Sequence, residues 1–260
     1  WLKQQHRGKA AQLLWMGLGG SKTDTAIFNL QNGAQITIKY SRGAGLGFVP
    51  WPGSFALGAF LDARAEELGL RGKRALELGS GACSVAGLVA GHLCKEVVLT
   101  DRLEVIGELA AHAQAAEESG MPSRWDAKVL DWTDLDFTFH SFEQGNYDII
   151  MMSDVVYYDF LWEPLMHTLF ALCTESTQVL WANCDKYPEY TPNVKSFLEL
   201  VERYFHVEVL EDREQSHCDG PSATAGGRVV IRSLRLADRE LAEEELTHAL
   251  HRGCARRCFM

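Results

Sequence analysis

Short apolar runs alternate with helical apolar spacing through the middle of the chain. Continuous apolar runs indicate buried strands, and apolar positions that recur every three or four residues indicate helices. The pattern predicts strands at 74–78, 96–100, 127–130, 147–153 and 177–182, and helices at 84–93, 103–118, 162–172 and 194–204. Strands that alternate with helices are typical of a parallel sheet with helical crossovers.

The segment before this alternation carries a hairpin signal. Residues 27–30 and 34–39 are strand-like and flank the dipeptide Asn32-Gly33, which is the strongest short signal for a tight β-turn. Further on, Ser54 is placed to cap a helix that ends near residue 65, because a serine oxygen accepts from the free amides of a helix start.

The segment after the alternation changes character. Residues 207–210 and 228–234 read as strands with no helix between them, and residues 237–250 have the spacing of an acidic helix. Two consecutive strands without a crossover predict an antiparallel pair. We therefore expect an α/β, Rossmann-like fold with a seven-strand sheet, its last strand antiparallel, and a short N-terminal β-hairpin extension.

The same pattern divides the chain into three parts. We expect an N-terminal segment at 1–26, one domain at 27–236, and a C-terminal helix and tail at 237–260. The first residue is Trp1 rather than Met, so we expect a trimmed chain or a fragment, and the sequence leaves open whether a targeting peptide preceded it.

The composition limits the kinds of partner and cellular compartment that suit the chain. Lys and Arg number 25 and Asp and Glu number 35, giving a net charge of −10. Such a chain lacks the basic surface that non-specific nucleic-acid binding requires, and no apolar run is long enough for a membrane span. The seven cysteines are an odd number, which favours free thiols in a reducing compartment.

The residues that carry chemistry begin where the first strand of the alternation ends. Leu76 to Ser84 reads LELGSGACS, so a strand enters a turn with Gly79 and Gly81 and then a helix. Glycines in such a turn let the backbone approach a ligand closely. Asp101 ends the next strand, where a carboxylate can accept hydrogen bonds from both ribose hydroxyls of an adenosyl cofactor.

Two cofactor classes fit this turn. A dinucleotide motif requires a third small residue where this chain has Ser84, and its pyrophosphate sits on the free amides of the helix. S-adenosylmethionine instead requires space for a methionine and an acid for its ammonium group. Glu77, inside the strand, suits the second use.

Two further motifs follow later strands of the alternation. Asp131-Trp132 and Asp154-Val155-Val156-Tyr157 come directly after predicted strands, and ligands of open α/β sheets bind at the carboxyl ends of the strands. Trp132 is placed to stack on adenine or to fill the core.

Together, Trp51, the 77–81 motif, Thr100-Asp101-Arg102, Asp131-Trp132 and Ser153-Asp154-Val155-Val156-Tyr157 resemble the class I, seven-strand S-adenosylmethionine-dependent methyltransferases. Over residues 27–236 the chain is most similar to the non-SET protein-lysine methyltransferases, a group that modifies chaperones, AAA ATPases and translation factors. All class I methyltransferases share the glycine motif, whereas Trp51 and the Asp-x-x-Tyr motif narrow the resemblance to this group.

The resemblance implies S-adenosylmethionine as cofactor, S-adenosylhomocysteine as product and a lysine of a protein as methyl acceptor. The implied cofactor-binding residues are Trp51, Glu77, Gly79, Ser80, Gly81, Asp101, Trp132 and Ser153. Asp154 and Tyr157 are implied as catalytic residues that border the methyl-transfer site. A dry aromatic pocket would favour the neutral amine, and Tyr157, Tyr158 and Trp181 are its candidate walls.

Three positions depart from the family pattern. The family often has Gly where Cys83 stands and Asn where His112 stands. After the fifth strand it tends to have an aromatic residue and an Arg, whereas this chain has Asn-Cys-Asp-Lys at 183–186. We expect cofactor binding to survive the first two changes and the third to affect substrate identity.

The expected setting is a monomer in the cytoplasm or nucleus with a protein substrate and without nucleic acid or membrane. Three rival functions stay open: methylation of a small molecule or another protein side chain, cofactor binding without catalysis, and an NAD-dependent oxidoreductase. His248, His251, Cys254 and Cys258 are of zinc-ligand type, but their spacing is loose, and we expect a solvated tail without metal.

Overall fold

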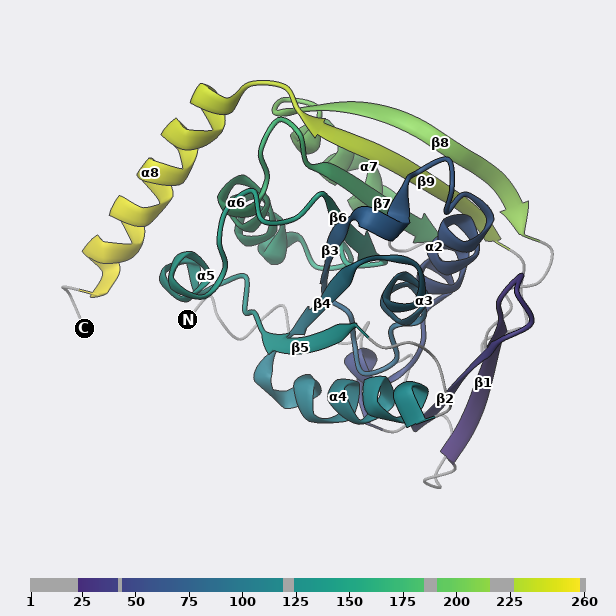
Figure 1. Cartoon of the computed structure of the whole chain (residues 1–260). Coiled ribbons are helices and arrows are strands. Elements are labelled where there is room, and N and C mark those ends of the chain that lie inside the picture. Colours follow the sequence, from purple (N-terminus) through teal and green to yellow (C-terminus); the bar gives the residue numbers. More distant parts are fainter. Residues whose placement is uncertain (1–22, 42–43, 119–123, 185–190, 216–226, 258–260) are drawn as a thin grey trace.

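The computed structural model describes residues 23–41, 44–118, 124–184, 191–215 and 227–257 (Figure 1). The strands of its large sheet are β3 (Arg74–Leu78), β4 (Glu96–Asp101), β5 (Trp125–Val129), β6 (Ile149–Ser153), β7 (Gln178–Cys184), β8 (Phe205–Gln215) and β9 (Gly227–Leu236). Their order is β5-β4-β3-β6-β7-β9-β8. Only β9 runs antiparallel to its neighbours, β7 and β8, so the predicted seven-strand sheet with an antiparallel last strand is confirmed.

Helices cover both faces of this sheet (Figure 1). They are α2 (Pro52–Ala63), α3 (Val85–Leu93), α4 (Leu103–Glu118), α5 (Leu135–Ser141), α6 (Trp162–Leu172), α7 (Thr191–Val201) and α8 (Arg239–Arg257). One buried core joins α2, α3 and α4 to the sheet, and a second joins α6, α7 and α8 to the opposite face. This alternation of sides follows from strands such as β3, whose neighbouring side chains Leu76 and Ala75 enter different cores.

The helices α4 and α6 have the predicted bounds, but other elements differ. The apolar pattern did not predict α5, because only Thr138 of this helix is buried and Phe137 and Phe139 are exposed. The strand β8 is longer than its apolar run, since backbone pairing with β9 continues through exposed charged residues.

A two-strand antiparallel sheet, β1 (Thr23–Asn29) with β2 (Gln35–Ser41), forms the predicted hairpin and begins earlier than residue 27. It lies apart from the large sheet, beside α3 and α4 (Figure 1). His112 of α4 joins the two parts: its Nδ1 lies 2.7 Å from the Ala82 carbonyl oxygen, and its Nε2 lies 2.7 Å from the Lys39 carbonyl oxygen. One side chain thus connects the hairpin to the glycine turn after β3.

No helix within the described ranges is long and apolar enough to cross a lipid bilayer.

Candidate active site

A cavity of about 640 Å³ lies at the carboxyl ends of β3, β4 and β6. β3 pairs with β4 on one side and β6 on the other, so the cavity lies where the strand order reverses, the usual ligand position in open α/β sheets. Nine of the ten predicted site residues line it: Trp51, Gly79, Ser80, Gly81, Asp101, Trp132, Ser153, Asp154 and Tyr157. The structure therefore brings together residues that are far apart in sequence.

The glycine turn forms the floor of this cavity. Gly79 has φ 66° and Gly81 has φ 61°, backbone angles that residues other than glycine rarely adopt. A Cβ on Gly79 would lie 3.1 Å from Cζ2 of Trp132, so the indole packs directly over this backbone. Ser80 is buried and fixes the turn, because its Oγ accepts from the Thr100 amide at 3.1 Å.

Asp101 ends β4 beside this turn and holds its carboxylate toward the cavity. One oxygen accepts from the Gly81 amide at 2.8 Å, and the other accepts from the Arg102 amide at 2.7 Å. Burial raises the pKa of Asp101 above its usual value, and these two amides oppose that rise. A carboxylate oxygen has two lone pairs, so each oxygen retains one for a further donor such as a ribose hydroxyl.

Glu77 is the predicted site residue that does not line the cavity. Its side chain is fully buried below the start of α3, where the Ser84 hydroxyl donates to Oε2. Burial raises the pKa of Glu77 to about 7, against the effect of hydrogen bonds from Ser84 and Ser80. Within the described residues Oε1 has no hydrogen-bond partner.

The first amides of α3 are occupied by the protein itself. The Ser54 hydroxyl accepts from the amides of Val85 and Ala86, both at 3.0 Å, and the Ser84 hydroxyl accepts from Gly87 at 2.8 Å. A dinucleotide pyrophosphate would need these amides as donors. The arrangement therefore disfavours a nicotinamide cofactor.

The prediction that Ser54 caps its own helix is wrong. α2 begins earlier, at Pro52, so Ser54 lies in its first turn, and there its hydroxyl is directed at the neighbouring helix α3. The contact of the Ser54 hydroxyl with α3 therefore depends on how α2 packs on α3.

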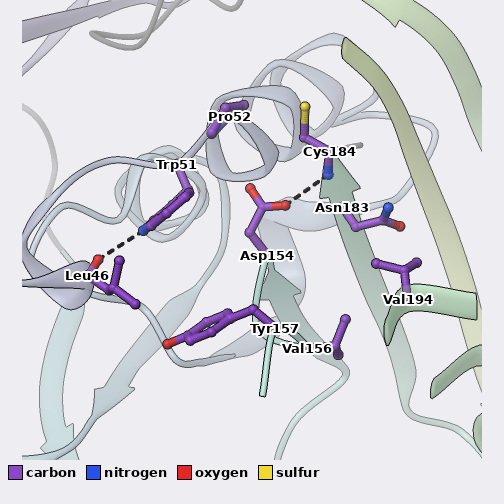
Figure 2. Close-up of a pocket in the computed structure, with 9 residues that line it drawn as sticks. All are labelled: Leu46, Trp51, Pro52, Asp154, Val156, Tyr157, Asn183, Cys184 and Val194. Atoms are coloured by element: carbon purple, nitrogen blue, oxygen red, sulfur yellow. Dashed lines mark hydrogen bonds between the residues drawn. The ribbon is translucent and has the colours of Figure 1, made fainter. Parts of the chain in front are cut away.

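A second, narrow cavity of about 40 Å³ adjoins the first (Figure 2). It is lined by Leu46, Trp51, Pro52, Asp154, Val156, Tyr157, Asn183, Cys184 and Val194. Leu46, Trp51, Asp154 and Tyr157 line both cavities. The Trp51 indole is fixed at this boundary, because its Nε1 donates to the Leu46 carbonyl at 2.9 Å (Figure 2).

Asp154 joins the beginning of α2 to the end of β7. Its Oδ2 accepts from the Gly53 amide at 2.6 Å. Its Oδ1 accepts from the Cys184 amide at 2.9 Å (Figure 2). The helix α2 has no capping side chain at Trp51, so the carboxylate of Asp154, the residue directly after β6, supplies the cap. Asp154 has φ 51°, a left-handed conformation that aspartate tolerates better than most residues.

The predicted aromatic walls are correct only in part. Tyr157 lines both cavities and Tyr158 lines the larger one. Trp181 is fully buried and lines neither. Its ring packs edge-on against Phe197 at 5.2 Å, and the Arg232 guanidinium lies 4.9 Å from its centroid, because its side chain points into the sheet core rather than toward the strand end.

The residues that depart from the family pattern lie at or near the site. Cys83 lines the larger cavity, and burial raises the pKa of its thiol to about 12. Asn183 and Cys184 line the narrow cavity, while positions 185 and 186 lie outside the described residues. Sequence reasoning missed Ser54, which lines the larger cavity, and Gly53, whose amide donates to Asp154. Nothing in the sequence signals a contact that one element makes with another.

Within the described residues no group of three or more His, Cys, Asp or Glu is arranged to hold a metal ion. Of the four zinc-type residues at the chain end, Cys258 and the side chain of Cys254 lie outside that description.

The geometry is that of a Rossmann-like α/β fold with a wide cavity at the carboxyl ends of its central strands and a narrow cavity beside it. A family model described as lysine methyltransferase matches residues 30–204. The protein N-lysine methyltransferase METTL21A of Mus musculus is 31% identical over 166 residues, which cover 64% of this chain and 72% of the relative. The protein-lysine methyltransferase METTL21E of the same species is 30% identical over 153 residues, 58% of this chain and 62% of the relative.

Among solved structures, P. horikoshii TYW2 in complex with MeSAdo superposes with a TM-score of 0.51 at 13% identity, covering 85% of this chain and 74% of that chain. At this identity the likeness concerns the fold. The chain belongs to the lysine methyltransferase family. Family membership confirms the prediction of a protein-lysine methyltransferase and speaks against the oxidoreductase.

Proposed function

We propose that the protein transfers a methyl group from S-adenosylmethionine to the side-chain amine of a lysine in a protein substrate. The observation that carries the proposal is the pair of adjoining cavities that share Leu46, Trp51, Asp154 and Tyr157. A methyl donor in the wide cavity and an amine in the narrow one would meet at this shared wall.

The wide cavity suits the cofactor. Asp101 would accept the ribose hydroxyls, Trp132 would flank the adenine, and Trp51 and Ser153 would border the methionine end. Because Ser54 and Ser84 occupy the start of α3, this wall offers few free donors to a phosphate and suits a cofactor that carries a sulfonium and an ammonium group. Bound S-adenosylmethionine would supply a methyl group already activated by its positive sulfur.

The narrow cavity suits the lysine chain. A volume of about 40 Å³ corresponds to roughly three water-sized groups in a row, and its walls are mostly apolar. The pocket would admit the end of a lysine side chain and exclude bulkier groups. Its walls would also align the nitrogen with the methyl, which is catalysis by proximity.

The chemistry requires a neutral amine. At pH 7 a lysine with a pKa near 10.4 is about 0.04% neutral, a cost of about 4.6 kcal/mol. Leu46, Val156 and Val194 limit solvation of the ammonium form and so lower this cost. The amine nitrogen then bonds to the methyl carbon as the carbon–sulfur bond breaks, and the pair of electrons stays on sulfur in S-adenosylhomocysteine.

We infer a setting in the cytoplasm or nucleus, with the protein acting as a monomer and without nucleic acid. Supporting it, Cys83, Cys94, Cys173 and Cys184 are free thiols among the described residues, as a reducing compartment would keep them. By family resemblance the substrate class is a chaperone, an ATPase or a translation factor.

The test is transfer of labelled methyl from S-adenosylmethionine into the proteins of a methylation-deficient cell lysate. Asp101→Ala should abolish labelling, and Asp126→Ala, which changes an exposed carboxylate of β5 outside both cavities, is its matched control. Calorimetry should show weaker cofactor binding for Asp101→Ala only, since each charge-assisted hydrogen bond is worth about 1.5–3 kcal/mol.

Acid hydrolysis of the labelled protein should release methylated lysine. Label that stays in protein-free small molecules, or in another amino acid, would contradict the lysine proposal. Cofactor binding without labelling of any fraction would favour a binding module, and saturable binding of NAD would favour the oxidoreductase.

A further inference from the structure

Three aromatic side chains make successive ring contacts, from the wall that the two cavities share to the exposed Phe160. The rings of Tyr157 and Tyr158 lie 4.6 Å apart, and the rings of Tyr158 and Phe160 are stacked at 5.2 Å. We call these three residues the aromatic ladder. Tyr157 lines both cavities, whereas Tyr158 and Phe160 line only the wider one.

The outer end of the ladder is unusually open. Phe160 is 69% exposed although it is a large apolar residue. Single exposed apolar side chains are common and need no explanation, and Leu103, 73% exposed, is such a case. Phe160 differs because it is the outer member of a series of ring contacts that begins at Tyr157, which lines both cavities.

The segment that carries the ladder contains acidic residues and no Lys or Arg, while Arg102 lines the same wide cavity. Residues 153–172 include the acids Asp154, Asp159 and Glu163 and no Lys or Arg. Asp159 and Glu163 are exposed on either side of Phe160 in the chain, and the whole chain carries a net charge of −10. A partner that docks here is therefore favoured when it is basic.

We propose that the aromatic ladder docks the part of the protein substrate that flanks the target lysine, and that it accepts one apolar side chain in a basic surrounding. The inference rests on the proposed lysine methylation. Two ring steps of 4.6 and 5.2 Å separate Tyr157 from Phe160, a span that about three residues of extended chain cover. The ladder thus selects substrates with an apolar residue within this reach of the lysine.

The experiment measures initial rates of methyl labelling in a dilution series of the methylation-deficient lysate, using four variants. Phe160→Ala removes the docking ring, Phe160→Leu keeps an apolar contact, and Asp159→Asn removes a charge. Leu103→Ala is the matched control, since Leu103 is equally exposed but outside both cavities. Calorimetry with S-adenosylmethionine accompanies each variant.

Phe160→Ala should lower the rate in dilute lysate about tenfold, the scale of one lost aromatic contact, and the deficit should narrow as the lysate is concentrated. Phe160→Leu should recover most of the rate, Leu103→Ala should match the wild type, and cofactor affinity should hold throughout. Asp159→Asn should lower the rate at low salt and have less effect near about 0.5 M salt.

Three results would overturn the inference while leaving the proposed function intact: wild-type rates for Phe160→Ala at every dilution, a loss equal at all dilutions, or a loss that follows weakened cofactor binding. A wild-type protein that binds the cofactor and labels nothing would overturn the proposed function, and the docking surface with it.

Discussion

Asp154, the first residue of the Asp-x-x-Tyr motif, lies where its carboxylate can serve two different roles. It borders both cavities, where it would act on the substrate amine, but it also accepts from the backbone of α2 and of β7. We predict that Asp154→Asn acts mainly through the second role. Asparagine tolerates the left-handed backbone at this position, so the substitution tests the hydrogen bonds without adding strain.

The expected magnitude follows from those bonds. Asparagine keeps one acceptor oxygen, and its amide group then faces either the Gly53 or the Cys184 N–H, which lie 2.6 and 2.9 Å from the present oxygens. Losing one charge-assisted hydrogen bond and leaving its donor unpaired costs about 2–3 kcal/mol. For a chain of this size the melting temperature should fall by about 4–12 °C.

A second substitution tests the same contact from the other side. A Cβ on Gly53 would lie 2.5 Å from Oδ2 of Asp154, so Gly53→Ala should displace the carboxylate and lower both stability and methyl transfer. The two substitutions should be far from additive, because each breaks the same bond. Gly72→Ala is the control, since nothing lies within 4 Å of its added Cβ.

The two roles of Asp154 are distinguished by measuring the melting temperature by calorimetry and the initial rate of methyl transfer on the same preparation of each variant. Asp154→Asn with a wild-type melting temperature and no activity would refute the bracing role and return Asp154 to direct action on the amine. Strict additivity with Gly53→Ala would refute it as well.

Two further predictions concern residues behind the cavity wall. Burial raises the pKa of Glu77 from 4.5 to about 7, so between these pH values the folded protein holds a proton that the unfolded chain has released. The melting temperature should therefore fall from pH 4.5 to about 7 and then level off. Glu77→Gln should flatten this fall, and an unchanged pH profile in the variant would contradict the prediction. His112→Ala should lower the free energy of unfolding by about 1–2 kcal/mol and speed hydrogen exchange in β1 and β2, because His112 contacts the Lys39 and Ala82 carbonyls. Exchange at the wild-type rate would show that other contacts hold the hairpin.

The spacing of apolar residues predicted those helices that bury one continuous apolar face. α4 and α6 each present a regular apolar face to a core, and their bounds were predicted correctly. α5 buries little more than Thr138, so it leaves no stripe; the signal that would have found it is Asp134, whose side chain accepts from the Phe137 amide at the helix start.

The site was predictable where it depends on strand ends. Gly79, Asp101 and Ser153 follow or end buried strands, and the sheet brings these ends together. The contact of Asp154 with Gly53 spans 101 positions in sequence and leaves no local trace. The place of Trp181 also depended on the direction of its side chain from β7, which sends the ring to the core face.

We propose that Ser54 makes cofactor selection depend on the packing of two helices rather than on groups that bind the ligand. Two neighbouring helices share one hydroxyl, so the position that would attract an anion is neutralised before any cofactor arrives. Selection of this kind needs neither a steric barrier nor a repelling charge. A dinucleotide would find no free amides at the usual position of its pyrophosphate, so we propose that this glycine turn serves a cationic cofactor instead.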